Sequence, residues 1–158
     1  MIIKFDLKKL LISLAIPLAV GGLSAFITRG SQDIYEQIKS PPLAPPSWAF
    51  PVAWSILYLL MGISLYLVWN SNADFDVKRR GIIFFILQLA LNFIWSPIFF
   101  ISKNFLLAFA VLILIWIFTL LMIISFYRTS KLAGLLQVPY LIWLTFAGYL
   151  NLSIYLLN

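Results

Sequence analysis

Residues 104–127 read NFLLAFAVLILIWIFTLLMIISFY, a run that carries no charged side chain. An α-helix needs about 20 predominantly apolar residues to cross the hydrocarbon core of a bilayer. Inside lipid every backbone N–H and C=O must be paired, and a helix pairs them within its own segment. This stretch therefore predicts a transmembrane helix.

The rest of the chain repeats this pattern. Further charge-free stretches cover residues 10–28, 40–73, 81–102 and 132–158. In the second of them, closely spaced prolines delay the helix, because proline lacks a backbone donor and is tolerated only in a first turn. The predicted spans are about 8–28, 51–70, 80–101, 104–127 and 132–156, with a long loop at 29–50. The predicted fold class is an all-α membrane protein, a bundle of five transmembrane helices that forms a single domain over residues 1–158.

The composition agrees with a membrane location. Of the 158 residues, 63% are hydrophobic and 10% are charged, whereas a soluble domain carries about 25% charged residues. The first apolar run is also longer than the core of a signal peptide, which has about 7–15 residues. We therefore expect this run to be retained as the first span.

The basic residues predict the orientation. Cytoplasmic loops carry an excess of lysine and arginine. With a cytoplasmic N-terminus, that side holds eight of the 11: Lys4, Lys8, Lys9, Lys78, Arg79, Arg80, Arg128 and Lys131. The other side holds Arg29, Lys39 and Lys103. We expect the C-terminus and the long loop to lie outside a bacterial cell membrane. Because the bases end the apolar runs, the net charge of +6 indicates lipid headgroups rather than nucleic acid as partner.

The chain lacks several chemical groups. It contains no His and no Cys, so it offers no imidazole or thiolate to a metal, and we expect no metal site and no cofactor. No Asp, Glu, Lys or Arg lies deep in a predicted span. Proton pumps, ion-coupled carriers and voltage sensors use such groups, which argues against all three. A pathway lined by amides and aromatic rings remains open.

Amide side chains within the spans are the sharper signal. Gln88 and Asn92 lie four residues apart on one helix face, and Asn151 lies on the last predicted span. The faces continue with Trp95, Ser96 and Phe99 in one span, and with Trp143 and Ala147 in the other. An amide that faces lipid costs several kcal/mol unless it is paired, so these amides should face the bundle interior. They can bond neighbouring helices or contact a ligand, and the two roles can coexist.

Aromatic residues form 17% of the chain. Trp48, Trp69 and Tyr127 lie near predicted helix ends, as in an interfacial belt. Others lie beside small or amide residues on a helix face: Trp54, Tyr58, Trp95, Tyr140 and Trp143. Large flat side chains beside small ones predict a slot for a planar polycyclic ligand. Simple packing of the helices is the alternative. The proline-rich residues 40–46 form either a lid over the outer mouth or a rigid entry into the second span.

Three motifs, in order, resemble a known family. The first loop and second span read SPPLAPP at 40–46, followed by Phe50, Trp54, Tyr58 and Gly62. The third span reads QLALNFIWS at 88–96, and the fifth reads PYLIW at 139–143, followed by Ala147 and Asn151. Over nearly the whole chain this resembles the tryptophan-rich sensory protein family, also called the translocator protein or TspO/MBR family.

The resemblance implies a five-helix bundle, commonly a homodimer, with a pocket that opens towards the first loop. Members bind porphyrins, and some bind sterols and benzodiazepine-type ligands. The ligand-binding residues expected from the helix faces and the resemblance are Pro45, Phe50, Trp54, Tyr58, Gln88, Asn92, Trp95, Phe99, Tyr140, Trp143, Ala147 and Asn151.

The chain departs from the family at two places. The family loop has Lys before its first proline and Trp two residues after it, where this chain has Ser40 and Leu43. Lid contacts should therefore differ. The family's sterol segment ends in Tyr and a basic residue, and no Lys or Arg follows Lys131 here, which argues against sterol binding.

These features predict a receptor or transporter-like membrane protein. The residues indicate an intramembrane pocket for a planar hydrophobic molecule, and the resemblance implies that the ligand is a protoporphyrin-type tetrapyrrole. The alternative is an enzyme that promotes light-dependent oxidative degradation of protoporphyrin, with Trp54 and Trp143 as the reacting side chains; otherwise no catalytic residue is expected. A scaffold whose amides and rings only pack helices is the third interpretation.

Overall fold

The computed structural model describes residues 3–31 and 33–158. These residues form seven α-helices and no strand. The helices are α1 (Leu7–Thr28), α2 (Ile34–Gln37), α3 (Ala49–Trp69), α4 (Phe75–Phe100), α5 (Phe105–Thr129), α6 (Lys131–Leu136) and α7 (Val138–Leu157). Five segments of the described chain are long and apolar enough to cross a membrane, with α6 and α7 together forming the fifth. The prediction of an all-α membrane protein with five spans is confirmed.

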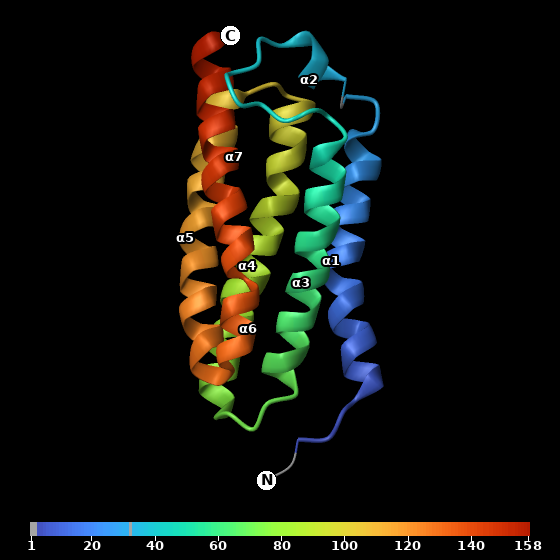
Figure 1. The fold of residues 1–158 in the computed structure, drawn as a ribbon, viewed down its shortest axis with the longest axis vertical. Helices are drawn as coiled ribbons and strands as arrows, with labels where there is room; N and C mark the ends of the chain where they lie inside the picture. Colours follow the sequence, from blue (N-terminus) through green and yellow to red (C-terminus); the bar gives the residue numbers. More distant parts are fainter. Residues whose placement is uncertain (1–2, 32) are drawn as a thin grey trace.

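The long helices run side by side, and the two chain ends lie at opposite ends of the bundle (Figure 1). Helix α1 packs on α3 and α4, and α5 packs on α4 and α7. Helix α6 packs on α3. The helices therefore form a ring in the order α1, α3, α6 with α7, α5 and α4. The loop that carries α2 lies across the end of the bundle where the chain finishes (Figure 1).

Side-chain caps fix several helix starts. Lys9 N donates to Oδ1 of Asp6 at 3.1 Å at the start of α1. Leu107 N donates in the same way to Oδ1 of Asn104 at 3.1 Å before α5. Such caps satisfy backbone donors that a helix start leaves without a partner. Asn104 also donates its backbone N–H to the carbonyl of Ile98 at the end of α4, so it connects the end of α4 to the start of α5.

The third span begins earlier than predicted. Helix α4 starts at Phe75, five residues before the start at about 80 that the sequence suggested. Asp74 occupies the N-cap position and Asp76 lies in the first turn, where negative charge stabilises the helix dipole. The basic residues Lys78, Arg79 and Arg80, which precede the apolar run, lie within the helix. Arg79 and Arg80 are exposed, so the helix includes them without burying their charge.

The last span contains a break that the sequence reading missed. Helix α6 ends at Leu136 and α7 begins at Val138, with Gln137 between them. Pro139 lies at the start of α7 and has no backbone N–H. An intrahelical bond is therefore lost at this point, and two helices form where one was predicted over 132–156.

Side chains fill the end of the bundle that holds the N-terminus. Phe85 stacks on Phe126 with ring centroids 6.1 Å apart, and Met122 and Val68 are fully buried. Close helix contact here depends on glycine, because a Cβ on Gly81 would lie 2.8 Å from the ring of Phe126. The described side chains of this half therefore form a tightly packed core.

Candidate functional site

A cavity of about 290 Å³ lies in the half of the bundle beneath the long loop. Four helices and the loop form its wall. The lining residues are Gly21, Ser24, Ala25, Thr28, Tyr35, Ser47, Phe50, Pro51, Trp54, Tyr58, Asn92, Trp95, Ser96, Phe99, Phe100, Trp143, Ala147, Leu150, Asn151 and Ile154. Most of these side chains are aromatic or small, with a few polar groups among them, which is the usual make-up of a small-molecule pocket.

The structure brings most of the predicted site residues together. Nine of the twelve line the cavity: Phe50, Trp54, Tyr58, Asn92, Trp95, Phe99, Trp143, Ala147 and Asn151. Pro45, Gln88 and Tyr140 are not part of the lining. Pro45 lies in the loop, whereas Gln88 and Tyr140 are buried below the cavity at 0% and 1% exposure.

A chain of hydrogen bonds forms the cavity floor. The Tyr58 hydroxyl donates to Oδ1 of Asn92 at 3.2 Å. Nδ2 of Asn92 donates to the Tyr140 hydroxyl at 2.8 Å, and this hydroxyl donates to Oε1 of Gln88 at 2.7 Å. The chain joins α3, α4 and α7. Asn92 thus pairs with neighbouring helices while it also faces the cavity, as the two interpretations of the amides together predicted.

Asn151 on α7 likewise lines the cavity and bonds neighbouring helices. Its Oδ1 accepts a hydrogen bond from Nε1 of Trp95 at 3.0 Å, and its Nδ2 donates to the carbonyl of Phe105 at 2.9 Å. These bonds connect α7 to α4 and to the start of α5. Both polar atoms of each cavity amide therefore already have one protein partner, which fixes the orientation of the amide, and each atom keeps the capacity for one further hydrogen bond.

Aromatic rings form the opposite wall. Trp54 stacks on Tyr58, with ring centroids 5.6 Å apart and an interplanar angle of 29°. Trp143 meets Trp54 edge-on at 6.3 Å and 87°, and Phe50 at 6.0 Å and 69°. Two indole faces at right angles can contact the plane and the edge of a flat ligand at the same time.

The sequence reading missed the contribution of α1. Gly21, Ser24, Ala25 and Thr28 all line the cavity. Their spacing of three and four residues places small side chains on one helix face, a signal that was present in the sequence. Gly21 is required there, because a Cβ at this position would clash with the ring of Tyr58. The loop residue Tyr35 also lines the cavity and was not predicted.

Three polar groups of the lining have no partner among the described residues: the Ser24 hydroxyl, the Tyr35 hydroxyl and Nε1 of Trp143. All three atoms are buried. Burial raises the pKa of the Tyr35 phenol, so its hydroxyl stays protonated near neutral pH and can donate. An indole N–H can only donate. The cavity therefore offers free donors to acceptor groups on the rim of an otherwise apolar ligand.

The long loop covers the end of the cavity. The Tyr149 hydroxyl donates to the carbonyl of Pro42 at 2.7 Å. Asn158 bonds the backbone of Lys39 twice, at 3.1 Å in each direction. Leu43, where the family has Trp, is 83% exposed and does not line the cavity. The loop contributes Tyr35 and Ser47 to the lining, but none of the residues 40–46, so the structure does not decide between a lid and a rigid entry for the prolines.

Residues 3–31 and 33–158 contain no group of three or more carboxylate, imidazole or thiol side chains that could hold a metal ion. Fold and cavity together define a class: a five-span α-helical membrane protein with an aromatic pocket between its helices. Residues 13–157 match the model of the TspO/MBR family, and the chain belongs to this family.

Relatives from three domains of life are similar over most of their length. The tryptophan-rich protein TspO of Archaeoglobus fulgidus is 40% identical over 97% of this chain and 99% of its own. Protein CrtK of Rhodobacter capsulatus is 40% identical over 78% of each chain. The human translocator protein is 35% identical over 77% of this chain and 72% of its own. The resemblance found in the motifs is thereby confirmed.

Proposed function

We propose that this protein binds a porphyrin-type tetrapyrrole, or a related planar hydrophobic molecule, in the cavity beneath the loop. The observation that carries this proposal is that two indole rings and hydrogen-bond donors without a protein partner line the same cavity. Trp54 and Trp143 provide flat apolar surface, and Tyr35 and Trp143 provide buried donors without a partner in the described chain. A porphyrin has a flat apolar ring and carboxylates at one edge, which matches this distribution.

The size of the cavity adds a condition. Ligand pockets usually measure about 300–1,000 Å³, and this cavity, at about 290 Å³, lies at the lower end. A ring as large as a tetrapyrrole therefore requires that part of the wall moves outward. The cavity floor is not expected to move outward, because the hydrogen bonds of Tyr58, Asn92 and Tyr140 connect it to three helices.

Equilibrium titration with protoporphyrin tests the proposal. Added protoporphyrin should quench the tryptophan fluorescence of the purified protein in lipid nanodiscs, and the quenching should saturate at one ligand per chain. Ala147→Phe places a large ring in the cavity wall and should abolish this binding. Ile142→Phe is the matched control, because Ile142 lies on the same helix but is 65% exposed to the outside of the bundle. Equal binding by both variants would place the ligand elsewhere.

A second candidate function is light-dependent degradation of the bound porphyrin. The contact between Trp54 and Trp143 at 6.3 Å favours it, because an indole beside an excited porphyrin can donate an electron to it, with dioxygen as the final oxidant. Illumination of the complex in air, with and without protein, tests this candidate. Loss of porphyrin absorbance faster than in protein-free nanodiscs supports the enzyme; an equal rate supports a receptor or transporter.

We further propose that the chain lies in a bacterial cell membrane with a cytoplasmic N-terminus and that it forms a homodimer. The cluster of basic residues at the N-terminal end of the bundle supports the orientation. The homodimer rests on the resemblance to the family. Sedimentation of the protein in a density-matched detergent, which gives the mass of the protein part, tests the dimer.

A further inference from the structure

The ring of helices is open beside the cavity. Helices α3 and α7 flank the cavity, yet they hardly contact each other, whereas α1 packs tightly on α3 and α5 packs tightly on α7. Helix α3 closes the ring through α6 instead, which lies near the opposite end of the bundle (Figure 1). A seam therefore runs between α3 and α7 at the level of the cavity.

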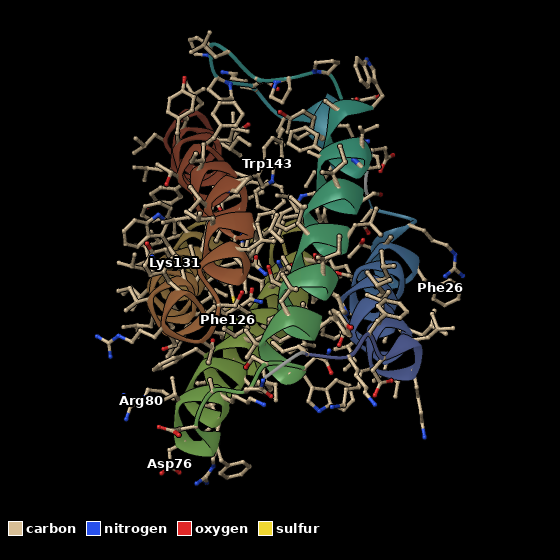
Figure 2. All side chains as sticks on the ribbon, turned by 60° about the horizontal axis from the view of Figure 1, so that its bottom comes forward. Phe26, Asp76, Arg80, Phe126, Lys131 and Trp143 are labelled. Atoms are coloured by element: carbon tan, nitrogen blue, oxygen red, sulfur yellow. The ribbon has the colours of Figure 1, made fainter. Side chains whose placement is uncertain are left out.

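Aromatic side chains meet across this seam. Trp143 of α7 meets Phe50 and Trp54 of α3, with ring centroids 6.0 and 6.3 Å apart, and Figure 2 shows Trp143 between the two helices. All three rings are half-buried. Within the described ranges no hydrogen bond joins α3 to α7. Edge-on ring contacts are individually weak, and no direct hydrogen bond opposes separation of the rings above the floor, where Tyr58, Asn92 and Tyr140 still link α3 to α7 through α4.

One residue of the cavity wall beside this seam is also exposed on the outside of the bundle. Pro51, in the first turn of α3, lines the cavity and is also exposed. The wall of the cavity is therefore a single residue thick at this point.

The loop at the end of the bundle is held more firmly. Asn158 bonds both the N–H and the carbonyl of Lys39, and Tyr149 bonds the carbonyl of Pro42 at 2.7 Å. Prolines between residues 41 and 46 restrict the backbone further. An opening at this end would break three hydrogen bonds, whereas a separation of the rings above the floor would break no direct hydrogen bond between α3 and α7 in the described chain.

We propose that the ligand enters and leaves the cavity sideways from the bilayer, when the rings of Phe50, Trp54 and Trp143 separate between α3 and α7. This inference rests on the proposed function. It adds that the ligand is already dissolved in the lipid when it reaches the protein. A planar apolar molecule partitions into the acyl region, so the seam meets it at a higher concentration than the loop does. The outward movement that a tetrapyrrole requires then also occurs at the seam.

A reversible lock on the loop tests the route. The chain has no cysteine of its own, and Lys39 lies beside Asn158, so the double variant Lys39→Cys/Asn158→Cys can be oxidised to a disulfide and confirmed by mass. Protoporphyrin is preloaded into nanodisc lipid, and the binding rate is compared before and after reduction. We expect the two rates to agree within about twofold. The single variants control for the substitutions.

The opposite result overturns the route. An oxidised rate that falls more than about tenfold and recovers on reduction would show entry through the loop. A second measurement does not depend on the disulfide: at a constant amount of porphyrin, added lipid in the same bilayer should slow binding in proportion to the surface dilution, whereas added empty vesicles should not. No binding in any form would contradict the proposed function instead of the route.

Discussion

The hydroxyl of Tyr140 on α7 donates a hydrogen bond to Oε1 of Gln88 on α4 at 2.7 Å, with both side chains at most 1% exposed. The same hydroxyl accepts from Asn92. One phenol therefore satisfies two amides in the interior of the bundle, below the cavity. Since an unsatisfied buried polar group is expensive, this residue should matter for stability even though it does not line the cavity.

Tyr140→Phe should destabilise the protein by about 1–3 kcal/mol, because it leaves Oε1 of Gln88 and Nδ2 of Asn92 without their partner. Thermal unfolding in nanodiscs measures the loss. Tyr127→Phe is the matched control, since Tyr127 is 46% exposed at a helix end and should unfold as the unmodified protein does. Equal melting temperatures for the two variants would show that the floor network does not stabilise the bundle.

Trp54→Phe and Trp143→Phe should each weaken porphyrin binding by about 2–12-fold, because an aromatic contact is worth about 0.5–1.5 kcal/mol beyond the area that it buries. Nε1 of Trp143 has no hydrogen-bond partner in the described structure, so its loss should leave the melting temperature nearly unchanged. If the protein degrades porphyrin in light, turnover should fall far more than affinity, since a phenyl ring is much harder to oxidise.

Trp116→Phe provides the comparison for these two variants. Its Nε1 donates to the hydroxyl of Thr145 at 2.9 Å, and it is not part of the cavity lining. It should lower the melting temperature and leave porphyrin affinity unchanged. Unchanged affinity and turnover in Trp54→Phe and Trp143→Phe would remove both residues from the site.

Gly21→Ala should weaken ligand binding, because the added methyl group would clash with the ring of Tyr58 and push it into the cavity. Gly22→Ala is a control on the adjacent residue, where a Cβ meets nothing within 4 Å. Both substitutions raise helix propensity equally, by up to about 1 kcal/mol. A titration of both variants with protoporphyrin compares them, and equal affinity would show that α1 does not shape the site.

Metal-free protoporphyrin should bind as tightly as haem or more tightly. Because the chain has no His and no Cys, it lacks the strong axial ligands that most haem proteins use. Parallel titrations with the two porphyrins measure the ratio. A much tighter haem complex with a sharp spectrum characteristic of protein-ligated iron would contradict the expectation and indicate ligation by Tyr or Met.

Reporter fusions test the orientation. An enzyme that is active only in the cytoplasm should work when fused to the N-terminus and fail at the C-terminus, because the positive-inside rule places the more basic end of the bundle in the cytoplasm. A reporter that requires export should give the reverse pattern. A cytoplasmic C-terminus would overturn the assignment.

Much of the fold followed from composition and local pattern. Charge-free runs long enough to cross a bilayer locate the five spans, because no alternative structure satisfies the backbone inside lipid. Helix periodicity also placed Asn92, Trp95 and Phe99 on one face, and these three residues do line the cavity. Such signals are local: each depends only on neighbours within a few turns of the same helix.

The tertiary structure alone decided how the faces meet. Tyr140 and Gln88 have the same kind of pattern as the cavity residues, yet their buried side chains bond each other and do not line the cavity. The small face of α1, by contrast, became part of the site only because Tyr58 of α3 lies against Gly21. The seam between α3 and α7 is equally invisible in the sequence. An apolar helix face can contact either lipid or another apolar helix, so its sequence does not show which one it contacts. The packing of side chains across helices determines where the bundle is filled and where it holds a cavity.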